Sequence, residues 1–324
     1  MAETIKDYEV IIVGGGPGGL TAGLYTSRAN RKTLLIEKYL PGGQIANTEE
    51  VEDYTGFELI SGAELAEKMT NHAKSFGLEI VSDEVGEIWS EGDHKMISTK
   101  SGKLYETKAV ILAPGGTATK LGIEGEDRLN GKGVSYCAIC DGAFFKGQII
   151  AVVGGGDAAV EEATFLTKFG SKVYIIHRRD QFRAQKIIQE RAFANPKIEV
   201  IWDSTAEKIE GETRVESLTI RNLKTKKTRD LAVGAVFPFI GFVPNSNLTR
   251  EELEKDSAGY ILTDEKMETS VKGIFACGDV RSQLVRQITN AVGDGTTAAV
   301  AAEKHIENLE DKSRQTSSAS SSAK

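Results

Sequence analysis

The sequence contains one strand, glycine turn and helix pattern twice, and this duplication most limits the possible folds. Residues 8–16, YEVIIVGGG, predict a buried parallel strand that runs into a glycine-rich turn, and a helix-like segment follows. Residues 149–170 repeat the pattern, and a shift of 140 residues places Gly14 on Gly154. We interpret this repeat as an internal duplication. The predicted fold class is α/β, with two Rossmann-like, doubly wound, three-layer domains that bind nucleotides.

The first glycine turn predicts a dinucleotide site. Its fingerprint, G-x-G-x-x-G, is formed by Gly14, Gly16 and Gly19. The first glycine permits a tight turn, the second lets a pyrophosphate approach the backbone, and the third lets the helix pack on the strand. The pyrophosphate would then meet the free N–H groups at the helix N-terminus. The next strand, TLLIE, ends in Glu37, which is placed to accept hydrogen bonds from a ribose 2′-hydroxyl.

The second glycine turn predicts a site for NADPH. Its fingerprint residues are Gly154, Gly156 and Ala159. The position that matches Glu37 is His177, which begins the segment His177-Arg178-Arg179-Asp180, and Arg183 follows. An acid at this place repels the 2′-phosphate of NADP, whereas arginine binds it with bidentate geometry. The alternative is an ordinary solvated basic cluster, and its position at the strand end favours the phosphate site.

A Cys-x-x-Cys motif lies between the two glycine turns. Cys137 and Cys140 can close a small disulfide, and Asp141 adds a group that can move the proton of thiol chemistry. A zinc site would need further ligands, but the only other cysteine is Cys277 and the four histidines are scattered, so we expect no metal. A purely structural disulfide is disfavoured in a cytosolic protein. The motif therefore predicts a redox-active pair.

Composition narrows the setting of this chemistry. The chain has 324 residues and a formal net charge of −7, which argues against non-specific nucleic-acid binding. The N-terminal segment lacks the features of a signal peptide, and no apolar run is long enough to cross a membrane. We therefore expect a cytoplasmic protein without a nucleic-acid or membrane partner.

The order of the motifs predicts a discontinuous first domain. The helix-like segment 286–308 is separated from the first glycine turn by the whole second repeat, and we expect it to return to the first domain. The second domain is then an insertion. The first domain is predicted to comprise residues 1–118 and 249–310. The inserted domain, residues 119–248, carries the cysteine pair, and residues 311–324 form a disordered serine-rich tail.

Taken together, these motifs resemble one family over residues 8–308. The motifs are GGGPGG, GGQ, CAICDG, GGGDAAVEE, HRRDQFRA and FACGDV, in that order. The chain resembles the low-molecular-weight, bacterial-type NADPH-dependent thioredoxin reductases, which are pyridine nucleotide-disulfide oxidoreductases. The resemblance implies a homodimer that contains FAD and passes electrons from NADPH to thioredoxin.

The resemblance also assigns residues to the two cofactors. It implies that FAD occupies the first glycine turn and that further FAD contacts come from Glu37, Gly42, Gly43, Gln44, Asp279, Val280, Arg286 and Gln287. NADPH would occupy the second turn. The resemblance further implies that Cys140 is the sulfur nearer the flavin, that Asp141 is the general acid and base, and that Cys137 attacks the disulfide of thioredoxin.

Some features leave alternatives open. The segment Ala113-Pro114-Gly115 stands where the family usually has Ala-Thr-Gly, which puts the local flavin contacts in doubt. Cys277 is expected to be a buried small side chain. The alternatives are a flavin-dependent reductase of another small disulfide protein, a non-enzymatic sensor that binds FAD and NADPH, and a binding module with vestigial fingerprints. Sustained turnover with a disulfide substrate would separate an enzyme from the other two.

Overall fold

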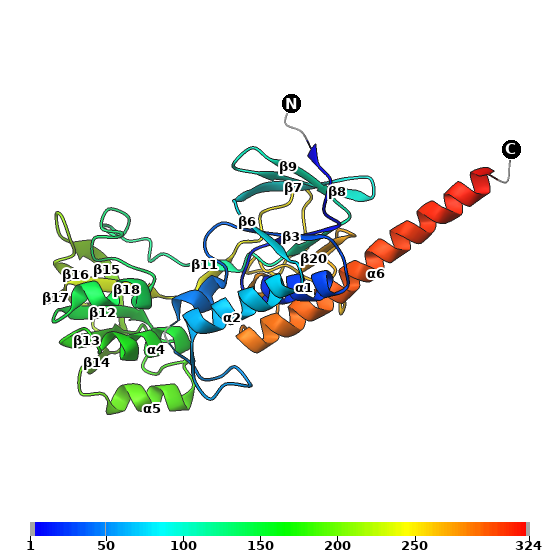
Figure 1. Cartoon of the computed structure of the whole chain (residues 1–324). Coiled ribbons are helices and arrows are strands. Elements are labelled where there is room, and N and C mark those ends of the chain that lie inside the picture. Colours follow the sequence, from blue (N-terminus) through cyan, green and yellow to red (C-terminus); the bar gives the residue numbers. More distant parts are fainter. Residues whose placement is uncertain (1–3, 49, 322–324) are drawn as a thin grey trace. The chain divides into compact units, whose positions relative to one another are not determined.

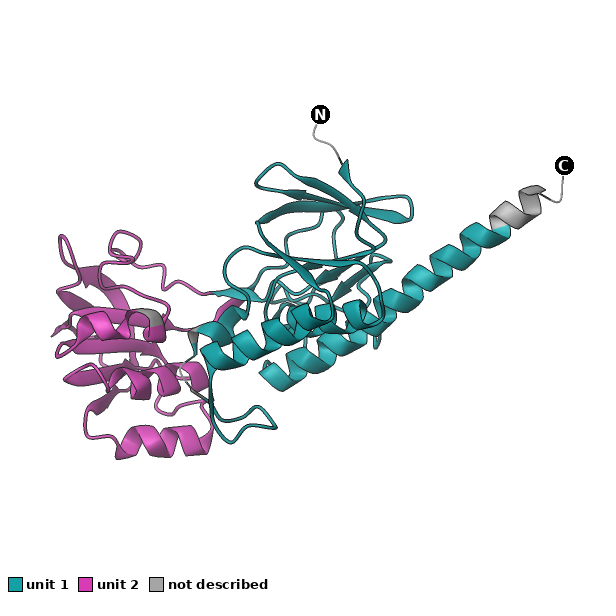
Figure 2. Ribbon diagram, viewed as in Figure 1, with its two compact units in different colours: residues 1–117, 244–324 teal, residues 118–243 magenta. Residues whose placement is uncertain are grey.

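The computed structural model describes residues 4–48 and 50–321, which form two compact units (Figures 1 and 2). Unit 1 comprises Met1–Thr117 and Pro244–Lys324, and unit 2 comprises Ala118–Val243, so the second unit interrupts the first. The two connecting segments pair as short strands, β11 (Gly116–Ala118) and β19 (Phe242–Pro244). The first border lies one residue before the predicted position 118, and the second lies five residues before the predicted position 248.

Unit 1 is built on a five-stranded parallel sheet. Across the sheet the strands are β20 (Ile274–Ala276), β10 (Ala109–Leu112), β2 (Val10–Val13), β3 (Thr33–Glu37) and β6 (Glu79–Ser82). All four residues of β2 are buried, as expected for a strand covered on both faces. The carboxyl ends of β2, β3 and β10 lie at one edge of the sheet, where α/β proteins bind their ligands.

Helices cover one face of this sheet and antiparallel strands cover the other. Val10 and Ile12 pack with residues of α1 (Pro17–Arg28) and α6 (Ile288–Ser321), whereas Ile11 and Val13 pack with residues of the antiparallel strands (Figure 1). That covering sheet consists of β7 (Val85–Glu91), β8 (His94–Thr99) and β9 (Leu104–Thr107), together with β1 (Thr4–Ile5). The remaining elements of unit 1 are α2 (Gly62–Ser75), η1 (Gly43–Asn47), η3 (Gly278–Val280), β4 (Glu50–Val51) and β5 (Ile60–Ser61).

Unit 2 repeats this architecture with four parallel strands. They are β14 (Ile198–Ile201), β13 (Lys172–Ile176), β12 (Ile149–Gly154) and β18 (Ala235–Phe239), in that order across the sheet. One face is covered by α4 (Asp157–Leu166) and α5 (Lys186–Ala194), and the other by β15 (Ser204–Glu210), β16 (Ser217–Asn222) and β17 (Thr228–Ala232). Its short helices are α3 (Ala138–Asp141) and η2 (Gly142–Phe145).

The predicted α/β fold with two Rossmann-like, three-layer domains is confirmed. The sequence predicts strand-like segments at 78–108 and 198–237, and the structure forms strands in both ranges. The sequence pattern did not place these strands as the layer that covers the second face of each parallel sheet, because alternation within a strand does not show what its apolar side packs against.

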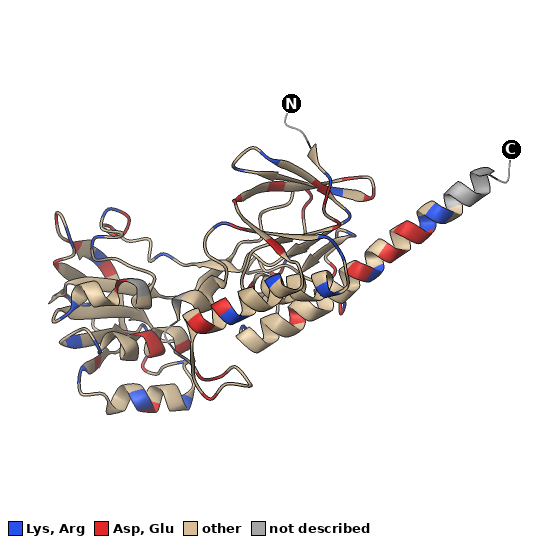
Figure 3. Ribbon diagram, viewed as in Figure 1, with Lys and Arg blue, Asp and Glu red and all other residues tan. Residues whose placement is uncertain are grey.

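Helix α6 differs from its prediction at its C-terminal end. It continues to Ser321, across most of the segment predicted to be a disordered tail from residue 311. Acidic and basic side chains succeed one another in its outer half (Figure 3), and residues such as Lys312, Arg314 and Gln315 favour a helix in the absence of packing. None of the helices in residues 4–48 and 50–321 combines the length and apolar character that crossing a membrane requires.

Candidate active site

In unit 1 the first glycine turn has the geometry that a pyrophosphate needs. Gly14 has φ of +100°, and a Cβ there would lie 2.3 Å from the carbonyl oxygen of Ala113. A Cβ on Gly19 would lie 1.9 Å from the Gly14 carbonyl oxygen, so the helix and the turn touch backbone to backbone. Around Gly16, by contrast, a Cβ would have no neighbour within 4 Å. The turn is closed on one side and open at Gly16, where a ligand can approach.

The helix that follows this turn leaves its first N–H groups to a ligand. Helix α1 begins after Gly16, no side chain of the described residues caps it, and its first turn contains no acid. Such an N-terminus favours an anion through its free N–H groups and its dipole. These features fit the pyrophosphate of a dinucleotide.

Two glycine substitutions separate folding from binding. Gly16→Ala should fold normally, because the backbone has φ of −70° and free space, yet fill the ligand's place and lower the FAD content severalfold. Gly19→Ala should instead destabilise the fold by about 3 kcal/mol through overpacking. Thermal unfolding and flavin absorbance per chain measure both effects. A Gly16→Ala protein with full flavin content would contradict this placement of the pyrophosphate.

Glu37 lies at the end of β3, beside the same turn. Its Oε2 accepts a hydrogen bond from the Gly15 N–H at 2.6 Å, and its Oε1 accepts one from the Tyr39 N–H at 2.8 Å. A carboxylate has further acceptor positions, so these bonds orient Glu37 and still leave it able to accept from a ribose hydroxyl.

The Gly42–Gly43 segment packs directly on the first turn. The Gly42 N–H donates to the Gly15 carbonyl at 2.7 Å, and a Cβ on Gly43 would lie 2.9 Å from the Gly16 Cα. Gln44 is exposed at the start of η1. The structure therefore brings this segment next to Gly16.

The turn η3, which contains Asp279 and Val280, also meets the first fingerprint. A Cβ on Gly18 would lie 3.2 Å from the Cys277 Sγ and 3.6 Å from the Gly278 nitrogen, so α1 packs tightly on the segment that leads into η3. Val280 is fully buried and Asp279 is partly buried. Burial raises the pKa of the Asp279 carboxyl, and Arg286 acts in the opposite direction.

Arg286 and Gln287 precede helix α6. The Arg286 guanidinium stacks over the Tyr260 ring at 3.9 Å from its centroid, and the Gln287 carbonyl accepts from the Ala291 N–H at 3.0 Å. Tyr260 was not predicted, because a single tyrosine in a polar segment gives no sequence signal of a stacking partner. It fixes the arginine in front of α6.

In unit 2 the second glycine turn repeats the first. A Cβ on Gly154 would lie 2.3 Å from the Phe239 carbonyl oxygen, whereas one on Gly156 would meet nothing within 4 Å. Ala159 is fully buried at the place that corresponds to Gly19. The turn therefore offers a second opening for a pyrophosphate, at Gly156.

The basic segment is anchored on this turn through its backbone. The Arg183 N–H donates to the Gly155 carbonyl at 2.8 Å, and the Gln185 N–H donates to Asp157 Oδ1 at 2.7 Å. The side chain of Gln185 adds a bond to Asp157 Oδ2 at 3.3 Å. The segment is thus held without the use of an arginine side chain.

The three arginines of the segment point to an anionic ligand. Arg178, Arg179 and Arg183 are exposed, and no carboxylate of the described residues lies within ion-pair distance of them. Guanidinium groups without an acidic partner, next to a glycine turn that can bind a pyrophosphate, suit the 2′-phosphate of NADPH.

His177 is buried behind the second turn. A Cβ on Gly155 would lie 2.3 Å from the imidazole, which packs on Phe182 and Trp202 with ring centroids 5.7 and 6.1 Å away. Burial lowers the pKa of His177, and Arg183 and Arg178 act in the same direction. The structure thus places His177 as a packing residue under the turn, and its predicted contact with the cofactor stays a prediction.

The cysteine segment packs on α4 of unit 2. Cys137 is in a disulfide, and its N–H donates to Ser135 Oγ at 3.1 Å. The Asp141 N–H donates to the Cys137 carbonyl at 3.2 Å, which closes one turn of helix around the motif. The side chain of Cys140 lies outside the described part of the structure, so its pairing with Cys137 stays a prediction.

Two features noted in the sequence have structural roles. The Pro114 carbonyl accepts a hydrogen bond from Asn245 Nδ2 at 3.0 Å. The Pro114 Cα lies 2.9 Å from a Cβ built on Gly14, so the Ala113-Pro114-Gly115 segment packs against the first turn. Cys277 is a free, fully buried thiol whose pKa is raised by burial. It packs in the core and is not part of the redox motif.

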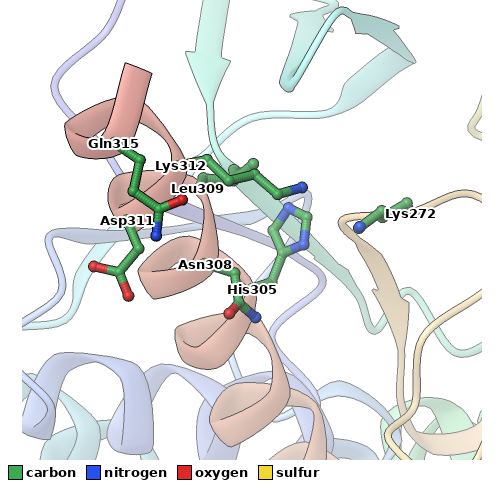
Figure 4. Close-up of a pocket in the computed structure, with 7 residues that line it drawn as sticks. All are labelled: Lys272, His305, Asn308, Leu309, Asp311, Lys312 and Gln315. Atoms are coloured by element: carbon green, nitrogen blue, oxygen red, sulfur yellow. The ribbon is translucent and has the colours of Figure 1, made fainter. Parts of the chain in front are cut away.

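A cavity of about 320 Å³ in unit 1 contains none of the predicted site residues. It is lined by Lys272, His305, Asn308, Leu309, Asp311, Lys312 and Gln315. Figure 4 shows Lys272 and Lys312 directed towards the His305 ring and Asp311 directed away from it. Within the described ranges, no three His, Cys, Asp or Glu side chains form a metal site.

Comparison with known proteins agrees with this geometry. Residues 8–295 match the family model described as pyridine nucleotide-disulphide oxidoreductase, and the chain belongs to this family. Within this family, the chain is similar to the thioredoxin reductases. The chain is 48% identical to a thioredoxin reductase of Bacillus subtilis over 94% of this chain and 97% of that protein.

Solved structures of thioredoxin reductases also match this chain. The crystal structure of Lactococcus lactis thioredoxin reductase matches with a TM-score of 0.90 and 47% identity, over 93% of this chain and 99% of that chain. Thioredoxin reductase of T. acidophilum matches with a TM-score of 0.88 and 31% identity, over 94% and 99% of the two chains.

Proposed function

We propose that this protein is an NADPH-dependent thioredoxin-disulfide reductase that contains FAD. The carrying observation is that unit 2 contains both the Cys137 disulfide, with Asp141 one turn away, and three uncompensated arginines beside a phosphate-type turn. Unit 2 thereby combines a proposed binding site for the reductant NADPH with a disulfide. The turn at Gly16 in unit 1 suits FAD.

The chemistry of the thiols follows from their arrangement in the chain. When bound, FAD accepts hydride from NADPH and supplies two electrons to the disulfide. We assign this disulfide to Cys137 and Cys140, whose reduction gives two thiols. The Cys137 thiolate then attacks one sulfur of the thioredoxin disulfide, a mixed disulfide forms, and a thioredoxin thiolate leaves. The Cys140 thiolate attacks Cys137, which releases the second thioredoxin thiolate and restores the disulfide.

Asp141 is the proton carrier in this proposal. The Cys140 thiol must lose its proton before it can attack as a thiolate, and the thioredoxin thiolate that leaves must take up a proton. Asp141 is adjacent in sequence to Cys140 and hydrogen-bonded through its N–H to the Cys137 carbonyl. It is the acid that the helical turn keeps beside the motif.

Partner, assembly and location complete the proposal. Thioredoxin is the substrate named by the B. subtilis and L. lactis relatives. We further propose a cytoplasmic homodimer, as the family resemblance implies. A redox pair kept in a reduced compartment agrees with the presence of only three cysteines in the sequence.

Steady-state NADPH oxidation tests the proposed function. The purified protein should be yellow and should oxidise NADPH rapidly with an oxidised bacterial thioredoxin, much more slowly with NADH, and hardly at all without a disulfide substrate. Turnover with another small disulfide protein but not with thioredoxin would show that the proposed substrate is wrong. Flavin reduction by NADPH without sustained turnover on any disulfide would favour a sensor, and no flavin reduction would contradict the NADPH site.

A further inference from the structure

One face of helix α6 holds the turn that contains Asp279. Asn290 and Asp294 are four residues apart on α6 and therefore lie on the same face, one turn from each other. Asp294 Oδ2 accepts a hydrogen bond from the Gly278 N–H at 3.1 Å, and both groups are buried. The carboxylate thus binds the first residue of η3 directly.

Asn290 reaches the same peptide through a second side chain. Asn290 Nδ2 donates to Gln283 Oε1 at 2.6 Å, and Gln283 Nε2 donates to the Gly278 carbonyl at 3.1 Å. Gly278 has φ of +72°, which glycine adopts readily and other residues rarely do. The N–H of this glycine is therefore held directly by α6, and its carbonyl is held by Gln283 and by the Arg281 N–H, which donates to it at 3.0 Å. The side chains of Asp294 and Asn290 thus contribute to the conformation of η3.

Asp294 also balances a buried charge. Arg281, the residue after η3, places its Nε 3.6 Å from Asp294 Oδ2, and the two side chains are only 14% and 10% exposed. Arg281 Nη1 is buried without a hydrogen-bond partner among the described residues, and Asp294 is the one acid of those residues that pairs with this guanidinium. Burial raises the pKa of Asp294, while Arg281 acts to lower it. Removal of the carboxylate would leave a buried cation uncompensated, which is costly.

We propose that Asp294 is a positioning residue of the flavin site: it fixes η3, and thereby Asp279 and Val280, for contact with FAD. This inference rests on the proposed FAD site. The side chain acts through Gly278 and Arg281 and needs no contact with the cofactor itself. The sequence signal is an acid enclosed by glycines, Gly293-Asp294-Gly295, and it is the first charged residue of helix α6.

The test compares FAD release from the holoproteins. Asp294→Asn should release FAD roughly tenfold faster or more, because the Arg281 charge is then left buried without its carboxylate beside η3, the turn proposed to contact FAD. The visible absorption bands of the flavin that stays bound should also shift, since the turn beside it has moved. Asp311→Asn, an exposed substitution of the same type on the same helix, should change the release rate by less than about twofold.

A double variant separates positioning from general damage. Arg281→Gln combined with Asp294→Asn removes both charges and should recover most of the lost FAD retention, because the buried cation is gone. Normal FAD release and an unchanged spectrum in Asp294→Asn would overturn the inference, as would a loss of thermal stability with normal release and no recovery in the double variant. If the wild-type protein itself bound no FAD, the proposed function would fail instead.

Discussion

Cys137→Ser is expected to abolish thioredoxin reduction while NADPH still bleaches the flavin. Without the Cys137 thiolate no mixed disulfide can form with thioredoxin, and loss of a covalent nucleophile lowers turnover by roughly three orders of magnitude or more. Flavin reduction does not need this sulfur. Two measurements check the result: steady-state NADPH oxidation with thioredoxin, and the flavin absorbance during anaerobic titration with NADPH.

A second cysteine variant gives the control for this experiment. Cys277→Ala also removes one sulfur, but the Cys277 thiol is free and fully buried in the core. Thioredoxin turnover should therefore persist in Cys277→Ala. If Cys137→Ser retained turnover, another sulfur would have to attack thioredoxin, and the assigned order of the two thiols would be wrong.

The double variant Arg178→Ala with Arg179→Ala is expected to raise the KM for NADPH about a hundredfold and that for NADH less than about twofold. Each hydrogen bond to a charged group contributes about 1.5–3 kcal/mol, and exposure to solvent keeps the pair near the lower end of that range. NADH lacks the 2′-phosphate and so loses nothing. Values of kcat/KM for both nucleotides, at one ionic strength, measure the effect.

The matched control removes two exposed charges elsewhere in unit 2. Lys227→Ala with Arg229→Ala changes the net charge equally, in and beside strand β17, and should leave both KM values within about twofold. Equal losses for NADPH and NADH in the Arg178 and Arg179 variant would contradict the assignment of these arginines to the 2′-phosphate.

Local patterns were enough to predict the strands and turns that carry the proposed nucleotide sites. The segment TLLIE was predicted as a strand, and β3 is Thr33–Glu37. The basic segment begins directly after β13, at the place that matches Glu37. These predictions succeed because a fully buried parallel strand must be a continuous apolar run, and because a glycine turn and a helix must follow it at fixed spacing.

Contacts between distant segments could not be predicted in this way. The stacking of Arg286 on Tyr260, the bond from Gln185 to Asp157 and the bond from Gly278 to Asp294 each join residues 16 to 28 positions apart. The side chains concerned are common and polar, and nothing in their local sequence marks their partners. Only the folded chain shows which of several nearby acids or amides makes the contact.

The way in which the basic segment 177–183 is anchored affects how a protein of this kind can evolve. The path of the segment is set by the main-chain bond from Arg183 to Gly155 and by the pairing of Asp157 with Gln185, whereas the three guanidinium groups extend from it without supporting the fold. Mutations at those arginines are therefore nearly free of a folding penalty. A lineage with this scaffold can exchange one pyridine nucleotide for the other in single steps, and each intermediate remains a folded protein on which selection can act.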